Sequence, residues 1–320
     1  MKEKIIFILA ITTFISCSIQ KKMTKTRREL GINMDMMYLK IDSTFIDKPF
    51  SFINYKNKND TIIVQNRYLH KFTFISQTEI TNRQFNVFLK YLKDNNLNEL
   101  YTKCKPDNNA WKKFGGDNLF YDSLSKYYHF IPDFLDFPIV NITYEAVLEY
   151  INWLNKIEPN KNIYYKLPNE KEWKFAFNTL EEDDTTFSWE GNNYRNKANS
   201  ILANFVQFDQ NQIRYDQIKD IISLKFSNSG YLGLINGPVN VYSYNPNMLG
   251  VYNISGNVAE LIENEYYKDS LGREFCTTKG GSWNSFLYYL RKHTNEIYVL
   301  PCPYVGFRIL KSEYKFKEID

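Results

Sequence analysis

Apolar side chains recur at helical spacing in three stretches of the chain, and each stretch follows a residue that can cap a helix. The first begins at Thr81, with Gln84 three residues later. The third opens at Asn169, with Glu172 three residues later. Both pairs have the spacing of a capping box, in which two side chains and two backbone amides satisfy each other. The apolar stripes comprise Phe85, Phe88, Leu89 and Leu92 in the first helix, Val147, Tyr150, Ile151 and Leu154 in a second helix from about 144 to 156 with Thr143 as its N-cap, and Trp173, Ala176 and Phe177 in the third.

Elsewhere the pattern changes to short alternating or apolar runs separated by turn-forming residues. Residues 37–45 and 68–75 alternate as strands do, and near the end of the chain the segment 249–261 reads LGVYNISGNVAEL. Residues 94–136 are polar and rich in Asn and Tyr, and residues 205–232 lie in a stretch of little periodicity. We interpret these two segments as possible insertions into a domain whose strands are joined by long loops.

The first sixteen residues have the pattern of a secretion signal. Lys2 and Lys4 precede an apolar run from 5 to 15, which is shorter than the roughly twenty residues needed to cross a bilayer as a helix. Ser16 followed by Cys17 is typical of a bacterial lipoprotein signal, so we expect cleavage after residue 16 and a diacylglycerol on the Cys17 thiol. The alternative is a buried N-terminal strand in which Cys17 is an ordinary core residue.

Net charge distinguishes this end of the chain from the rest. The formal charge is +4, but residues 1–28 hold seven Lys or Arg against one Glu, which leaves 33 basic and 35 acidic residues elsewhere. A domain of net charge −2 does not have the basic surface that nucleic-acid binding requires, so we expect no nucleic-acid partner. We interpret residues 17–36 as a lipidated basic tether that contacts anionic head groups or is simply a solvated linker.

Composition adds two limits. The 320 residues are 43% hydrophobic and 17% aromatic, which is enough to bury a substantial core in one large or two small domains. The mean hydropathy of −0.47 excludes a multispanning membrane protein.

Six short motifs resemble, in order and spacing, those of the formylglycine-generating enzyme family, also called the sulfatase-modifying factor family. The resemblance implies one domain over residues 37–313, followed by a tail at 314–320. It also implies an α+β fold, a variant of the C-type-lectin-like fold with small twisted antiparallel sheets, a few helices and long irregular loops. Motifs of this kind indicate the fold rather than the activity. They are TEITNRQ at 78–84, FPIVNITY at 137–144, KLPNEKEW at 166–173, YNISGNVAEL at 252–261, GGSW at 280–283 and GFRIL at 306–310.

A glycine turn within the fourth motif has the composition of a hard-cation site. Asn253 and Glu260 carry side-chain oxygens on either side of Gly256. By resemblance, these two side chains and the carbonyl groups of Gly256 and Val258 form a calcium site, and calcium is the expected cofactor. The alternative is a turn held by hydrogen bonds alone. A second family site, which lacks a carboxylate here, maps onto Asn204, Phe205 and Tyr231.

The resemblance also implies where oxidation chemistry would occur, and there the chain departs from the family. Family enzymes bind Cu(I) through two cysteine thiolates after the Gly-Gly-Ser motif, and they use O2 to convert a substrate cysteine to formylglycine. Ser285 and Leu290 occupy those two positions here, whereas Ser282 matches a family active-site serine. A hydroxyl and an isobutyl group cannot form a linear thiolate site. We therefore expect no copper and no catalytic residue in this chain.

The remaining cysteines leave three arrangements open, and the histidines indicate no metal site. Cys276 and Cys302 enter neighbouring predicted strands, where an exported protein has either a disulfide or two unpaired buried thiols. A relocated copper pair is a third possibility. Cys104 makes the number odd. The histidines, which have no metal-binding spacing, are His70, His129 and His293.

We therefore expect a catalytically silent family member, lipid-anchored in a bacterial cell envelope at the outer membrane, with an envelope protein as its partner. Lipoproteins of the gliding-motility and protein-secretion machines of Bacteroidetes are similar to this fold and lack the copper cysteines. Two alternatives remain open. One is an envelope oxidase with a non-standard site on the same scaffold, and the other is a lectin-like lipoprotein that binds glycan or protein through its loops.

Overall fold

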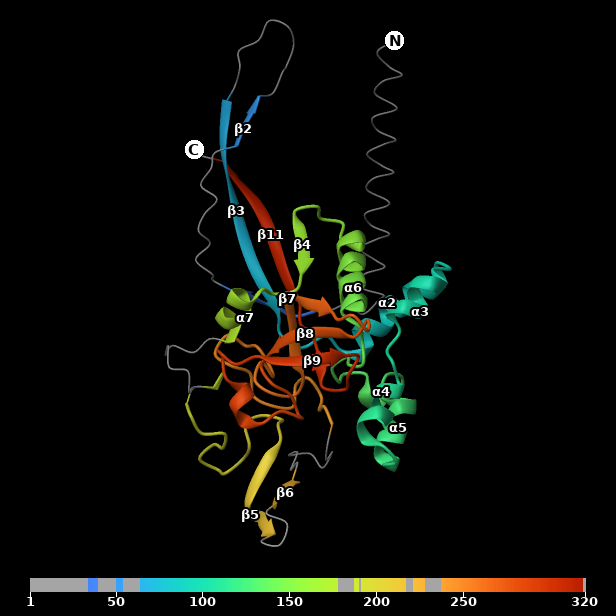
Figure 1. The fold of residues 1–320 in the computed structure, drawn as a ribbon. Coiled ribbons are helices and arrows are strands. Elements are labelled where there is room, and N and C mark those ends of the chain that lie inside the picture. Colours follow the sequence, from blue (N-terminus) through green and yellow to red (C-terminus); the bar gives the residue numbers. More distant parts are fainter. Residues whose placement is uncertain are drawn as a thin grey trace, which may run out of the picture.

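Figure 1 shows the computed structural model of the chain, which has an α+β fold, as predicted. The expected signal peptide (1–16), Cys17, most of the tether and Tyr231 lie outside the residues that the structure describes. None of the helices in the described ranges combines the length and the apolar character needed to cross a bilayer. The described residues are 34–39, 50–53, 64–177, 187–189, 191–216, 221–227 and 237–318.

The largest sheet is built around a long antiparallel pair, β3 and β11, which runs side by side from the centre of the molecule toward one end (Figure 1). Its register pairs Ile75 with Leu310 and Arg67 with Glu318. The boundary expected at 313 falls inside β11, so residues 314–318 belong to the sheet and are not a tail. The strand order is β1-β3-β11-β4, with β2 also paired to β3, and the strands are β1 (Met36–Leu39), β2 (Phe50–Ile53), β3 (Val64–Ser76), β4 (Ile163–Lys166) and β11 (Leu310–Glu318).

A second sheet has the order β10-β7-β8-β9. Strand β10 joins β7 in parallel, whereas the other strand pairs in the described residues are antiparallel, as the resemblance implies. The segment 205–232 contains a separate antiparallel pair, β5 and β6, although its sequence shows no clear period. These strands are β5 (Gln207–Asp216), β6 (Ile221–Ser227), β7 (Ala259–Lys268), β8 (Glu274–Lys279), β9 (Glu296–Leu300) and β10 (Val305–Gly306).

The three helices predicted from their caps are all present. At the first, the Thr81 hydroxyl accepts the Gln84 amide at 3.2 Å, and the Gln84 side chain accepts the Thr81 amide at 2.9 Å. At the third, Asn169 and Glu172 exchange the same two bonds at 2.9 and 3.0 Å. Thr143 caps the second. The helices are α2 (Asn82–Asp94), α6 (Tyr144–Ile157) and α7 (Glu170–Phe177).

Residues 94–136 fold into short helices that pack on the domain (Figure 1). The Asn118 side chain begins α5 by accepting the Phe120 amide at 2.9 Å. Trp111 of α4 is fully buried and stacks on Trp283, with the ring centroids 6.4 Å apart. This segment therefore covers part of the core. Its elements are α3 (Asn98–Cys104), α4 (Asn109–Gly115), α5 (Leu119–Tyr127) and the 3-10 helix η1 (Pro132–Phe134).

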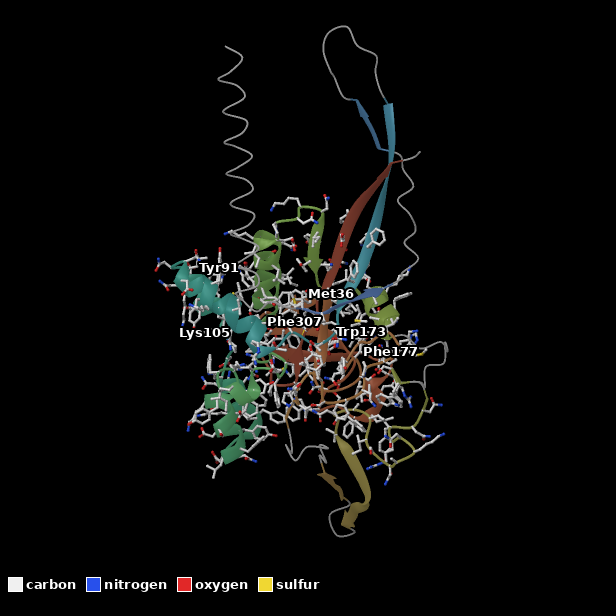
Figure 2. All side chains as sticks on the ribbon, turned by 180° about the vertical axis from the view of Figure 1, so that it is seen from behind. Met36, Tyr91, Lys105, Trp173, Phe177 and Phe307 are labelled. Atoms are coloured by element: carbon white, nitrogen blue, oxygen red, sulfur yellow. The ribbon has the colours of Figure 1, made fainter. Side chains whose placement is uncertain are left out.

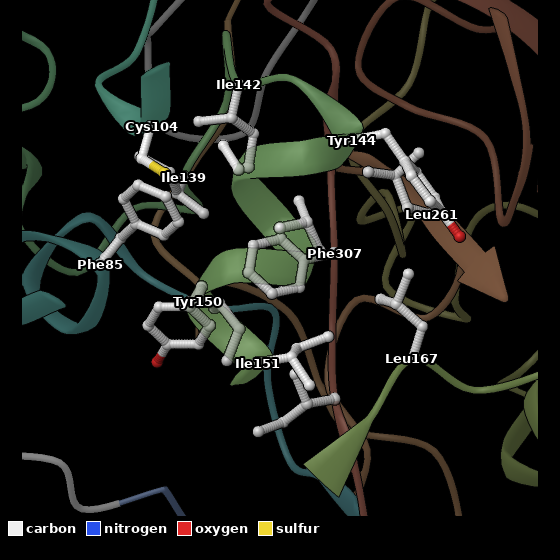
Figure 3. Close-up of a cluster of buried hydrophobic side chains, with 14 of the residues drawn as sticks. Phe85, Cys104, Ile139, Ile142, Tyr144, Tyr150, Ile151, Leu167, Leu261 and Phe307 are labelled. Atoms are coloured by element: carbon white, nitrogen blue, oxygen red, sulfur yellow. The ribbon is translucent and has the colours of Figure 1, made fainter. Parts of the chain in front are cut away.

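The main hydrophobic core lies between α2, α6 and the C-terminal strands. Figure 3 shows Phe85, Tyr150 and Phe307 converging there. Phe85 stacks on Tyr150 at 5.3 Å between ring centroids and meets Phe307 edge-on at 6.5 Å, and such pairs contribute about 0.5–1.5 kcal/mol beyond the area they bury. Figure 2 places Phe307 near the middle of the molecule, between Tyr91 on one side and Trp173 on the other. The core thus fixes the last apolar motif of the chain against the helices.

Candidate functional site

A buried ion pair joins two of the sequence motifs. Arg308 follows Phe307 in the core, and both Arg308 and Glu260 of β7 are fully buried. The Arg308 Nε lies 2.7 Å from each carboxylate oxygen of Glu260, and its Nη2 lies 2.5 Å from Oε1. Trp173 of α7 donates its indole N–H to Glu260 Oε2 at 2.7 Å. Hydrogen bonds that are assisted by charge in this way are short and strong.

The other guanidinium donors of Arg308 reach backbone carbonyls. Nη1 donates to the carbonyl oxygen of Ser76 at 3.0 Å, and Nη2 donates to that of Tyr252 at 2.8 Å. A buried charge costs several kcal/mol in lost hydration unless its partners are well placed. Arg308 therefore ties the end of β3 and the turn before β7 to β7 itself.

A second buried carboxylate, Glu79, lies beside this pair. Its oxygens accept hydrogen bonds from the side-chain amides of Asn257 at 2.9 Å and Asn253 at 3.3 Å. Burial raises the pKa of Glu79 to about 7, an effect that Arg308 opposes and Glu260 reinforces. Two carboxylates and one guanidinium thus form one buried centre, which we call the Arg308 centre and define as Glu79, Glu260 and Arg308.

Glu260 and Asn253, the two side chains expected to bind calcium, lie in and beside this centre, but their contacts do not fit the ion. Both carboxylate oxygens of Glu260 face Arg308. Asn253 donates its amide N–H groups to Glu79 and to the carbonyl oxygen of Val241, the latter at 2.9 Å. The guanidinium already holds the carboxylate that a calcium ion would require. Calcium binding is thus a prediction of the sequence that these contacts do not support.

Backbone contacts hold the glycine turn. Gly256 has a φ of 90° and donates its amide to the carbonyl oxygen of Gly280 at 2.8 Å. A Cβ at Gly256 would lie 2.6 Å from the carbonyl oxygen of Asn204, so only glycine permits this approach. Gly256 of the first expected calcium site therefore lies next to Asn204 of the second. Their other residues are Val258 and Phe205, which are buried in separate apolar clusters, and Tyr231, which lies outside the described residues.

The two positions that hold copper cysteines in the family are closed to solvent here. Ser285 is 1% exposed and Leu290 is 0% exposed. Leu290 ends the 3-10 helix η2 (Leu287–Leu290) and belongs to an apolar cluster with Phe187 and Phe205. A hydroxyl and an alkyl group in a closed site offer no soft ligand to Cu(I). The residues present do not fit the family's metal.

Polar side chains of β9 surround Ser285. Its hydroxyl accepts the Ser282 amide at 2.9 Å, lies 3.0 Å from the Ser282 hydroxyl and 3.1 Å from the Tyr298 hydroxyl, and donates to the Glu296 carboxylate. Burial is the main cause that raises the pKa of both Glu296 and Tyr298. We call Ser282, Ser285, Glu296 and Tyr298 the Ser285 cluster. Its groups satisfy one another and include neither a thiolate nor a histidine.

The three described cysteines are buried and carry thiols. The Cys276 sulfur lies 3.9 Å from the carbonyl oxygen of Tyr298. Burial raises the pKa of the Cys302 thiol, with Cys276 adding to the effect, and it raises the pKa of Cys104 to about 12. The structure therefore has Cys276 and Cys302 as buried thiols, not as the disulfide that was the other sequence alternative. Raised pKa values disfavour the thiolates that copper needs.

Sequence reasoning assigned no role to Glu79 or Arg308, although both lie within the family-like motifs. Each is a lone charge between uncharged neighbours, in Thr-Glu-Ile and in Phe-Arg-Ile. A charged residue inside a buried run requires a partner, which is the signal that could have indicated the pair. Glu296 and Tyr298 are two residues apart on β9 and so face the same side, but nothing in the sequence relates them to Ser285.

Comparison with solved structures gives three similar chains. CarF is 16% identical, with 90% of this chain and 97% of CarF covered and a TM-score of 0.47. PvdO from Pseudomonas aeruginosa is 15% identical, with 87% and 91% covered and a TM-score of 0.45. Treponema denticola variable protein 1 is 15% identical, with 86% and 94% covered and a TM-score of 0.44. A search of curated protein sequences finds no match.

The family comparison covers most of the chain. Residues 50–313 match the Sulfatase-modifying factor enzyme 1-like domain. The six motifs between 78 and 310 all fall inside this range, as do the Arg308 centre and the Ser285 cluster. The chain therefore belongs to the sulfatase-modifying factor enzyme 1-like family.

Proposed function

We propose that this protein is a catalytically silent member of its family and serves as a binding or structural component of a bacterial cell envelope. In this proposal a lipid on Cys17 anchors the chain at the outer membrane, residues 17–36 form the tether, and the domain binds an envelope partner. The basic and apolar start that ends in Ser16 and Cys17 supports the anchor. Two or more acyl chains bury enough methylene groups to hold a protein at a membrane.

The observation that carries the proposal is the chemistry at the two copper positions. Ser285 is enclosed by hydrogen-bonding partners and Leu290 by apolar side chains. Neither can supply the soft, deprotonated sulfur that stabilises Cu(I). Since one fold can carry many functions, the site and not the family decides the activity. The buried thiols of Cys276 and Cys302 give little support to an oxidase with a relocated site, because burial raises the pKa of Cys302 and so opposes formation of its thiolate.

The absence of copper binding and of oxidase activity is tested with the full-length protein in detergent. Cu(I) is titrated against a competing chelator, and a cysteine-containing peptide is incubated with O2 and analysed for aldehyde by mass spectrometry. We expect the parent protein to bind no stoichiometric Cu(I) and to form no aldehyde. The double variant Ser285→Cys/Leu290→Cys restores two thiols and is expected to gain affinity for Cu(I). Aldehyde formation by the copper-loaded parent would refute the proposal.

The anchor has a separate test. Cys17→Ser is expected to move the protein from the membrane fraction to the soluble fraction and to abolish incorporation of labelled fatty acid. Ser18→Ala, which changes the neighbouring residue, is the matched control and is expected to leave both unchanged. Membrane retention of Cys17→Ser at the parental level would contradict the lipid anchor.

A further inference from the structure

A pocket that includes neither Ser285 nor Leu290 lies between α6, β4 and β7. Its volume is about 350 Å³, near the lower end of the roughly 300–1,000 Å³ that is common for small-ligand sites. It therefore has room for one long side chain. Its lining includes Tyr144, Leu148, Tyr164, Leu167, Glu263 and Tyr266.

Contacts between the three elements fix the walls of this pocket. Figure 1 shows β4 beside α6, where the Asn155 side chain accepts the Tyr165 amide at 2.7 Å and donates to the Tyr165 carbonyl oxygen at 2.9 Å. Tyr144 of α6 stacks on Tyr266 of β7 at 4.6 Å between ring centroids. A pocket whose walls are already fixed requires little ordering when a ligand binds.

An excess of carboxylates gives the pocket a negative charge. Lys166 lies between two of them, with its Nζ 2.8 Å from an oxygen of Glu172 and 2.9 Å from Glu263 Oε2. Burial acts to lower the pKa of Lys166, but the hydrogen bonds to both carboxylates raise it overall. One cation and two carboxylates leave a net charge of −1. Asn264 and Glu265, the neighbours of Glu263 whose side chains the structure does not describe, include no cation.

Glu263 has a carboxylate oxygen that a ligand can use. Its ion pair with Lys166 uses Oε2, no bond to its Oε1 is present among the described residues, and the side chain is 36% exposed. Glu145 accepts the Tyr266 hydroxyl at 2.8 Å and pairs with Lys268 at 2.7 Å, so these two charges balance each other. A pocket with one carboxylate in excess attracts a cation.

The rest of the lining suits a basic side chain. Ile151 and Leu167 are buried and offer an apolar surface to the methylene groups of such a side chain. Tyr144, Tyr164 and Tyr266 bring three aromatic rings to the same pocket. The face of a tyrosine ring attracts an ammonium or a guanidinium group. An anionic ligand would meet the Glu263 carboxylate unfavourably, and an apolar one would leave Oε1 without a partner.

Exposed apolar side chains in the lining indicate a partner larger than a free cation. Leu148 of α6 is 41% exposed, and Tyr164 of β4 is 52% exposed. A free amine would leave both in water. A polypeptide segment can cover both while its basic side chain enters the pocket, which buries apolar area as well as pairing the charge.

We propose that this pocket receives an Arg or Lys side chain of a polypeptide partner, with its cation beside Glu263 Oε1 and the tyrosine rings. The inference rests on the proposed function of the chain as a binding component, and it names the chemistry of the partner segment.

The experiment measures binding of short peptides to the full-length protein in detergent. Two peptides carry a central Arg or a central Lys, flanked by the same leucine and serine residues. Their neutral counterparts carry citrulline in place of Arg and norleucine in place of Lys. Free arginine amide tests whether the rest of the peptide contributes.

Two variants test the pocket, and each has a matched control. Glu263→Gln removes the carboxylate in excess, whereas Glu99→Gln removes an exposed carboxylate of α3 outside the pocket. Tyr164→Lys adds a cation at a side chain that is 52% exposed. Tyr267→Lys makes the same change on β7 at a side chain that is 54% exposed and outside the pocket.

We expect the Arg or the Lys peptide to bind at least about tenfold more tightly than its neutral counterpart and than free arginine amide. Glu263→Gln and Tyr164→Lys should each weaken this binding at least about tenfold, whereas both controls stay within about twofold. The inference is overturned by no binding of either charged peptide, by equal binding of charged and neutral peptides, by equally tight binding of arginine amide, or by unchanged binding in Glu263→Gln. If the parent and both test variants capture an envelope protein equally, the inference fails and the proposed function stands. Aldehyde-forming activity would instead refute the proposed function.

Discussion

Two buried polar regions of this domain are built in different ways. The Arg308 centre holds charges from three separate motifs, and its guanidinium is paired with a carboxylate and with backbone carbonyls. The Ser285 cluster lies where family enzymes bind copper, and it consists mostly of neutral hydroxyl groups that bond one another. Motifs that identify the family in this chain thus provide the buried contacts that hold its strands and turns together. A match to them reports the architecture and leaves the chemistry to be decided at Ser285 and Leu290.

The largest loss of stability is expected from a substitution in the Arg308 centre. Arg308→Met leaves the carboxylates of Glu260 and Glu79 buried without their cation, which should lower the free energy of unfolding by about 3–5 kcal/mol. Urea denaturation followed by tryptophan fluorescence measures the loss. Arg273→Met is the matched control, because Arg273 and Asp269 form an ion pair at the surface, where the loss of a pair has little effect on stability. Similar losses in the two variants would contradict the role given to the Arg308 centre.

The same region predicts a dependence of stability on pH. The pKa of Glu79 is about 7 in the folded protein against an ordinary value of 4.5, so the folded state binds the proton more tightly. The stability that this proton contributes is complete below pH 4.5 and is lost as the pH rises through 7. The free energy of unfolding falls by at most about 3 kcal/mol over this range. Glu79→Gln cannot ionise and should flatten this part of the stability curve.

Melting temperatures between pH 4.5 and pH 8 measure that difference. Glu99→Gln replaces an exposed carboxylate of α3 and should retain the parental pH profile. A parental profile in Glu79→Gln would assign the pH dependence to another group.

A smaller loss of stability is expected from a substitution in the Ser285 cluster. Ser285→Ala removes the acceptor of the buried Ser282 amide and a donor to Glu296, which should cost about 1–3 kcal/mol. Ser200→Ala, in a loop and partly exposed, should stay within about 0.5 kcal/mol. Both are measured by urea denaturation. A loss at Ser285 as large as that of Arg308→Met would remove the distinction between the two regions.

The smallest effect is expected from calcium. Because Glu260 is held by Arg308, the melting temperature should be the same in excess calcium and in chelator. A bound ligand at a hundred times its dissociation constant stabilises a protein by about 2.7 kcal/mol, so a real site would shift the melting temperature by several degrees. Such a shift, absent in Glu260→Gln, would restore the calcium site that the motif suggested.

Local features of the fold could be predicted from the sequence because their causes are local. The capping pairs of Thr81 with Gln84 and of Asn169 with Glu172 lie three residues apart and form the expected bonds. The apolar stripe of α6 is buried as its spacing indicates. The family-like motifs predicted the α+β class, which the structure has.

Other features depend on contacts between distant parts of the chain, which no local pattern encodes. Glu79 and Arg308 lie near opposite ends of the domain sequence, and only the fold places them together. For the same reason the motif at Asn253 indicated a cation site, although the cation near Glu260 is the side chain of Arg308. The extent of β11 was missed because residues 314–318 become a strand only through pairing with β3.

The pairing of β3 with β11 also constrains how the molecule is made. In the sheet β3 lies beside β11, so the sheet is completed only after residues 310–318 have left the ribosome. Until then one edge of the β3 segment, residues 64–76, has no partner strand, because β11 lies more than two hundred residues further along the chain. Contacts over such a distance require closure of a long loop, which makes assembly slow. The main sheet therefore stays incomplete until residues 310–318 have been synthesised.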